Sequence, residues 1–175
     1  MRIDFHTHII PSDIPNFKQK FGYGGFITLQ DMENGKMMLK DTGEKFRFIS
    51  CNCYNAQSRI SECRQHDVDI QVLSTVPVMF NYWAKPKDTA EICTFLNNHM
   101  SSVVKDNPDH FIGLGTLPMN DVQLALEELD RCILDLGLFG VEIGTNINGK
   151  NLDDPSFFPL YKRMEELGAV VFVHP

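Results

Sequence analysis

Two patterns of hydrophobic positions alternate along the chain. Short runs of apolar residues predict buried strands, and segments in which apolar residues recur every three or four positions predict amphipathic helices. Strands are predicted at 1–8, 70–76, 111–117, 140–145 and 169–174. Helices are predicted between them, at 57–66, from 88 to about 104, from about 121 to 136, and at 154–167. Strand and helix therefore alternate over most of the chain.

Local signals set the boundaries of these helices. The stretch 88–91 (Asp-Thr-Ala-Glu) has the form of a capping box, which predicts that Asp88 is the N-cap of the long helix. Pro155 follows Asp154 and favours a helix start, because proline is tolerated at the first helical position. Gly137 and Gly168 come directly after the last apolar position of their helices, where a left-handed cap favours glycine.

Five strands joined by helical crossovers predict parallel pairing with right-handed connections. An open doubly wound sheet and a (β/α)₈ barrel both begin in this way. No Gly-x-Gly-x-x-Gly turn follows the first strand, so the nucleotide-binding form of the open sheet has no support. Histidines end the first and fifth strands, which face each other across the axis of an eight-stranded barrel. We therefore predict one α/β domain, 1–175, of the TIM-barrel type, incomplete, with about five of eight strands.

A long segment, about 9–53, separates the first strand from the first helix. Three short strands are predicted in it, at 26–30, 37–40 and 46–49, with turn signals at Asn34-Gly35 and at 41–43. This pattern predicts a small antiparallel β insertion, in the place where α/β barrels build the walls of their active sites. Arg47 lies between two phenylalanines on the last of these strands. It is either a solvent-exposed side chain or a group that binds a carboxylate.

The histidines at the strand ends are the candidate metal ligands. Side chains alternate across a strand, so His6 and His8 are expected to point to the same side and Ile3, Phe5 and Thr7 to the other. Neutral imidazole is a common ligand for zinc. The alternative is that the two histidines are hydrogen-bonded polar residues that close a buried strand. His174, at the end of the last apolar run, favours ligation.

Composition narrows the classes of partner. The 175 residues are 43% hydrophobic and 22% charged, which is typical of a globular domain with a sizeable core. A net charge of −7 leaves no basic patch for nucleic acid or anionic membrane, so small-molecule or protein partners are favoured. Polar residues near the N-terminus occupy the place of a signal-peptide core, and the five cysteines form no disulfide pattern. We expect a cytoplasmic protein with reduced thiols.

Several longer stretches carry a family resemblance: His6-Thr7-His8 and 21–25, 73–80, 82–86, 113–119 and 172–175. With these the chain resembles the decarboxylase branch of the amidohydrolase superfamily. The resemblance implies a Zn²⁺-dependent, oxygen-independent loss of a carboxylate, with His6, His8 and His174 as metal ligands. It also implies that Arg47 binds one carboxylate of a small dicarboxylate substrate, that Lys40 assists with a second, and that the enzyme is a homodimer. His66, His99 and His110 match no site motif and are read as surface or helix-end residues.

The resemblance also implies residues that this chain does not contain. A (β/α)₈ barrel typically needs about 250 residues, so three strands with their helices are absent. The family's fourth metal ligand, an aspartate, and its proton-handling histidine are expected beyond Pro175. The 175 residues alone are therefore expected to be inactive. The alternatives are another amidohydrolase-type decarboxylase or hydrolase, or an inactive truncated form that binds a full-length subunit.

Overall fold

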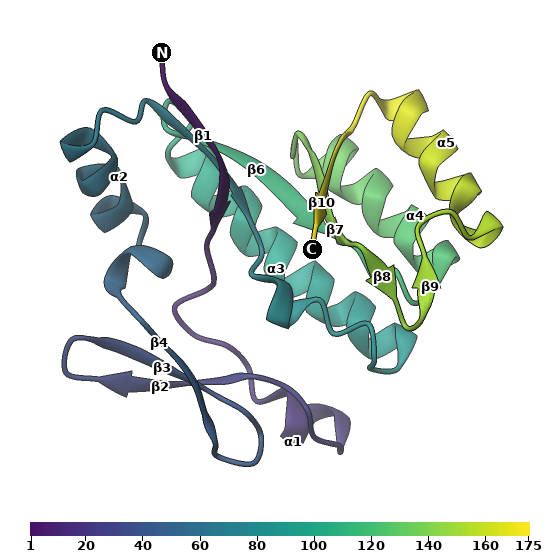
Figure 1. The fold of residues 1–175 in the computed structure, drawn as a ribbon, viewed down its shortest axis with the longest axis horizontal. Coiled ribbons are helices and arrows are strands. Elements are labelled where there is room, and N and C mark those ends of the chain that lie inside the picture. Colours follow the sequence, from purple (N-terminus) through teal and green to yellow (C-terminus); the bar gives the residue numbers. More distant parts are fainter.

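The computed structural model describes residues 1–175 and contains a curled sheet of five parallel strands (Figure 1). These are β1 (Ile3–His8), β5 (Ile70–Ser74), β6 (Phe111–Thr116), β7 (Gly140–Gly144) and β10 (Val170–His174). Their order in the sheet, β1-β5-β6-β7-β10, is their order in the chain. Consecutive order with parallel pairing is the arrangement of a TIM barrel. The prediction of an incomplete barrel with five strands is confirmed.

Strand register brings the predicted histidines to one end of the sheet. His8 pairs with Ser74 at the end of β5, and His174 pairs with Gly144 at the end of β7. The β7–β10 pairing is regular, but β1 shifts register against β5 between Asp4 and Thr7. Gly140 allows the close approach of β7 to β10, because a Cβ atom there would collide with the carbonyl group of Val170.

Four helices follow strands of the barrel: α2 (Ala56–Gln65), α3 (Pro86–Asp106), α4 (Val122–Asp130) and α5 (Phe158–Leu167). Apolar residues of α4 and α5 pack against β7 in one core cluster that includes Leu129, Val141 and Leu160. Met100 of α3 belongs to another core cluster, together with Leu73 and Phe111. Short elements complete this region: β8 (Asn146–Ile147), β9 (Lys150–Asn151) and 3₁₀ turns at Cys51–Cys53, Pro77–Met79 and Pro155–Phe157.

Two predicted helix features are wrong in detail. Helix α3 begins at Pro86 with Lys85 as N-cap, so Asp88 lies inside the first turn, where its carboxylate accepts a hydrogen bond from Tyr23. Proline at the first helical position explains the earlier start. The helix predicted as continuous to 136 ends as α4 at Asp130 and continues as a π-helical turn, Arg131–Asp135. Gly168 ends α5 in the left-handed conformation, as predicted.

The insertion after β1 forms a separate three-stranded antiparallel sheet, which confirms the predicted insertion (Figure 1). It contains α1 (Phe17–Phe21), β2 (Thr28–Met32), β3 (Gly35–Leu39) and β4 (Lys45–Ile49). Its buried residues Phe26, Met38 and Ile49 share a core cluster with Ile92 and Leu96 of α3. The small sheet is therefore held against the barrel by apolar packing. None of the helices combines the length and the apolar character that a membrane crossing requires, and all five cysteines are free thiols.

Candidate metal centre

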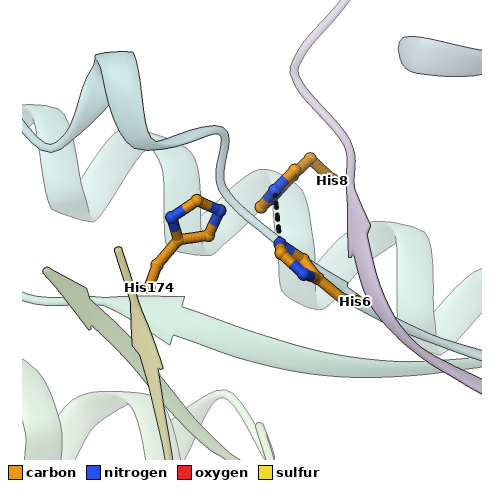
Figure 2. A group of neighbouring side chains, drawn as sticks. All are labelled: His6, His8 and His174. Carbon is orange, nitrogen blue, oxygen red and sulfur yellow. Dashed lines mark hydrogen bonds between the residues drawn. The ribbon is translucent and has the colours of Figure 1, made fainter.

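The three histidines predicted as ligands lie together at the end of the curled sheet (Figure 2). One ring nitrogen from each lies within 4.8 Å of the others. The Nε2 atoms of His6 and His8 are 3.2 Å apart, and the ring of His174 has its centroid 4.8 Å from that of His6. The structure therefore brings together side chains from the first and the last strand of the sheet.

The register shift in β1 changes the side-chain alternation expected there. The rings of Phe5 and His6 both approach Phe172 of β10, with centroid separations of 5.4 and 5.0 Å. Thr7 is buried and donates a hydrogen bond from Oγ1 to the carbonyl oxygen of Val72. A bulge of this kind re-aims side chains near a strand end, and here it accompanies the convergence of His6 and His8.

The spacing of these nitrogens fits a zinc-sized ion. Two nitrogens bound to one zinc ion at about 2.0–2.1 Å and a tetrahedral angle lie about 3.3 Å apart, close to the 3.2 Å between the Nε2 atoms of His6 and His8. Two ligand atoms on one ion are never more than about 4.2 Å apart. A separation of 4.8 Å must therefore close by about 1.5 Å for tetrahedral binding, which rotation of the side chains can supply.

The environment of His8 favours the neutral ring that a metal requires. Burial, together with the neighbouring His174 and His6, lowers the pKa of His8 to about 4. Its Nδ1 lies 3.0 Å from the hydroxyl oxygen of Ser74. That hydroxyl donates its own proton to the carbonyl oxygen of Thr7, so its oxygen is left to accept from Nδ1. Nε2 of His8 then carries the free lone pair on the side of His6.

A cavity of about 400 Å³ opens beside His6 and His8 and is lined by the last strand of the small sheet. Arg47 lines this cavity and forms no ion pair with any residue of the chain. Phe46 and Phe48 also line it, and both are exposed rather than turned into the core. No aspartate or glutamate contributes to the lining. The cavity therefore offers positive charge and aromatic surface to an anionic ligand.

Arg59 is a second guanidinium in this lining that sequence reasoning missed. It is buried, and it donates hydrogen bonds to the carbonyl oxygens of Asn52 and His8 and to the side chain of Gln71. In the sequence it appears only as one polar position of a predicted helix, which gave no signal of its role.

Lys40 does not line the cavity. Its ammonium group pairs with Glu44 over 2.9 Å at the turn between β3 and β4, where both side chains are largely exposed. A role for Lys40 in binding a second carboxylate stays a prediction that no contact in the structure supports.

Glu142 is the other residue that sequence reasoning missed. Its side chain is 0% exposed on β7, and Oε1 lies 3.9 Å from Nδ1 of His8. Burial raises the pKa of Glu142 to about 8. The sequence held a signal for this residue, because 140–144 (Gly-Val-Glu-Ile-Gly) places one carboxylate in an otherwise apolar strand.

Comparison with known proteins decides the family. The sequence model of the Amidohydrolase family matches residues 3–175. The chain belongs to this family. Among its curated relatives, this amidohydrolase is 53% identical over 175 residues to 2-amino-3-carboxymuconate-6-semialdehyde decarboxylase of Dictyostelium discoideum, covering 100% of the chain and 49% of that protein. It is 40% identical over 184 residues to the protein of the same name from Caenorhabditis elegans, with 94% and 46% covered.

A solved structure shares the fold of this amidohydrolase. The 5-carboxyvanillate decarboxylase of Novosphingobium aromaticivorans, with bound manganese, superposes with a TM-score of 0.75 at 18% identity, covering 100% of the chain and 51% of that structure. The chain thus spans about half the length of the relatives and of the structure that it matches.

Proposed function

We propose that this chain carries part of the active site of a zinc-dependent 2-amino-3-carboxymuconate 6-semialdehyde decarboxylase. The observation that carries the proposal is the cavity beside His6 and His8, which is lined by two arginine residues and by no aspartate or glutamate. A dicarboxylate substrate of modest size suits this charge and this volume. The 53% identity to the Dictyostelium discoideum decarboxylase over all 175 residues supports the same substrate.

In this proposal His6, His8 and His174 hold the metal through neutral imidazole nitrogens. When bound, zinc supplies a water molecule whose pKa is lowered toward about 7, which provides a nucleophile at neutral pH. Arg47 binds a carboxylate of the substrate through the two parallel N–H groups of its guanidinium. The rings of Phe46 and Phe48 flank it and offer surface to the conjugated part of the substrate.

The proposed reaction removes carbon dioxide without oxygen and yields 2-aminomuconate 6-semialdehyde. It places the protein in tryptophan degradation by the kynurenine route, where it limits the formation of quinolinate. We also propose that the protein acts in the cytoplasm and as a homodimer. These assignments rest on the sequence resemblance and on the chemistry of the cavity.

The decisive experiment is a substrate comparison with the zinc-loaded product of the complete coding sequence. Loss of 2-amino-3-carboxymuconate 6-semialdehyde is followed by absorbance, together with stoichiometric release of carbon dioxide. Two aromatic acids, 2,6-dihydroxybenzoate and 5-carboxyvanillate, are offered in parallel. We expect turnover of the muconate and little of either aromatic acid. Decarboxylation of an aromatic acid alone would assign the protein to another decarboxylase of this family.

A further inference from the structure

Glu142 has an environment that a purely structural residue seldom has. Its side chain is fully buried on β7, and neither carboxylate oxygen has a hydrogen-bond partner in the protein. A buried polar group without a partner costs about 1–3 kcal/mol, and a charged one costs more. The large majority of buried side-chain polar atoms avoid this cost. Glu142 therefore needs an explanation other than its contribution to folding.

The side chain of Glu142 faces one particular atom of the metal centre. Its Oε1 lies 3.9 Å from Nδ1 of His8, the ring nitrogen that also lies 3.0 Å from the hydroxyl oxygen of Ser74. The other nitrogen of His8, Nε2, lies 3.2 Å from Nε2 of His6. Glu142 is thus on the side of His8 away from the candidate ion, and it does not belong to the three-histidine group.

We propose that Glu142 is a positioning residue that acts with Ser74 on His8, holding the proton on Nδ1 and the free lone pair of Nε2 toward the metal. The proposal rests on the metal centre proposed above. Ser74 accepts a hydrogen bond from the Nδ1–H group, and Oε1 of Glu142, 3.9 Å from Nδ1, places negative partial charge on the same side of the ring, which favours this tautomer. A metal-bound histidine commonly uses a carboxylate or carbonyl oxygen in this way, and the loss of such a partner weakens metal binding by about 10–100-fold.

Ser74, Glu142 and His8 are far apart in the sequence, and the arrangement of the strands brings them together. Ser74 ends β5 and is the register partner of His8 on β1, which fixes their contact. Glu142 is on β7, where it pairs in register with Thr116 of β6 and with Phe172 of β10. Curling of the sheet brings the Glu142 side chain across the interior to β1.

The test measures the dissociation constant of zinc alone by competition with a chromophoric chelator, using the full chain. Glu142→Gln keeps the size of the side chain and replaces one carboxyl oxygen with an NH₂ group, and Ser74→Ala removes the hydroxyl. Both variants are expected to bind zinc about 10–100-fold more weakly. Ser74→Thr, which retains a hydroxyl, is expected to restore most of the affinity.

Two matched controls separate this role from a structural one. Glu128 is a buried glutamate paired with Arg131, and Ser101 is a buried serine bonded to the carbonyl oxygen of Leu136. Glu128→Gln and Ser101→Ala are expected to lower the unfolding temperature of the metal-free protein and to leave zinc affinity within about twofold. Glu142→Gln is expected to weaken zinc binding and not to lower the unfolding temperature of the metal-free protein. The unfolding temperature is kept because a buried amide is less costly than a buried carboxyl group that can ionise.

A second readout reports the tautomer itself. The ¹⁵N chemical shifts of His8 in the metal-free protein are expected to show a protonated Nδ1, and a mixture of tautomers in Glu142→Gln. Unchanged shifts and unchanged zinc affinity in Glu142→Gln would overturn the proposal, as would equal weakening in Glu128→Gln. Two zinc ions per wild-type chain, reduced to one by Glu142→Gln, would make Glu142 a ligand and also overturn it. Failure of the wild-type chain to bind zinc would refute the metal centre itself, and this role with it.

Discussion

Arg59 donates a hydrogen bond from Nη2 to the carbonyl oxygen of His8 over 2.5 Å. The bond joins helix α2 to the last residue of β1, and the same guanidinium reaches the carbonyl oxygen of Asn52. All three hydrogen bonds of Arg59 go to uncharged acceptors. Arg59 thus fixes the backbone that carries His8 and brings positive charge to the cavity wall.

Replacement of Arg59 should therefore destabilise the protein. Arg59→Met leaves two backbone carbonyl groups without their donor, and each buried acceptor left in this way costs about 1–3 kcal/mol. We expect the free energy of unfolding in urea to fall by about 2–6 kcal/mol, the sum for the two groups. Arg64→Met, at an exposed position of the same helix, is the control. Equal stability of the two variants would show that the Arg59 bonds are not maintained in solution.

Removal of any one of the three histidines should abolish tight metal binding. His6→Ala, His8→Ala and His174→Ala each delete a direct ligand, so the loss of zinc affinity should exceed the roughly 10–100-fold that an outer hydrogen-bond partner contributes. Zinc content after dialysis against a weak chelator, measured by elemental analysis, provides the comparison. His110→Ala is the control, because His110 precedes β6 at the opposite end of the sheet. Full zinc occupancy in His174→Ala would remove that residue from the ligand set.

Arg47 should affect substrate binding and not metal binding. Arg47→Ala removes a guanidinium from the cavity, so binding of the dicarboxylate substrate is expected to weaken tenfold or more, about 1.4 kcal/mol, with unchanged zinc content. Arg47→Lys should also be impaired, because a single ammonium group cannot reproduce two parallel hydrogen bonds. Lys45→Ala removes a positive charge from the same strand outside the cavity lining and serves as the control. Loss of zinc with unchanged substrate affinity would contradict the proposed role.

His99 should make the protein less stable in mild acid. The interpretation of His99 as a surface or helix-end residue is wrong, because His99 lies within α3 and is partly buried. Burial lowers the pKa of His99 below its usual 6.5, so the unfolded chain takes up a proton at a higher pH than the folded one. Stability is therefore lost as the pH falls below 6.5 toward the folded-state value. His99→Gln should lose less free energy of unfolding between about pH 7.5 and pH 5.5 than the wild type. His66→Gln, at the exposed end of α2, controls for the removal of an imidazole.

Much of the fold could be predicted because the strands have local sequence signals. Apolar runs such as 70–76 and 169–174 are too short for helices and are bounded by proline or glycine, and turn signals divide the insertion into three strands. One error arose because Asp88 suits two different positions. Asp88 suits an N-cap, yet Pro86 begins the helix earlier and Asp88 instead accepts a hydrogen bond from Tyr23. The π-helical turn at 131–135 leaves no periodic signal in the sequence.

The candidate site could be predicted only in part. His6, His8 and His174 stand at strand ends, so strand order alone predicts that they converge. Arg47 reaches the same cavity through the insertion, whose position against the barrel depends on packing with α3. Arg59 bonds to the backbone of His8, which is 51 residues away in the sequence. Glu142 faces His8 from a distant strand. Contacts of that kind depend on the curvature of the sheet, which no local pattern contains.

The consecutive order of the five strands has a consequence for the timing of assembly. Each strand of the curled sheet pairs with the sheet strand that precedes it in the chain, so the sheet can grow from its N-terminal edge as the chain leaves the ribosome. His6 and His8 emerge first, but His174 belongs to the strand that is made last of the five. At a synthesis rate of about 5–20 residues per second, roughly ten to thirty seconds separate the first ligands from the third. In the proposed metal centre, binding of the ion by all three rings is therefore a late event that requires the fifth strand of the curled sheet.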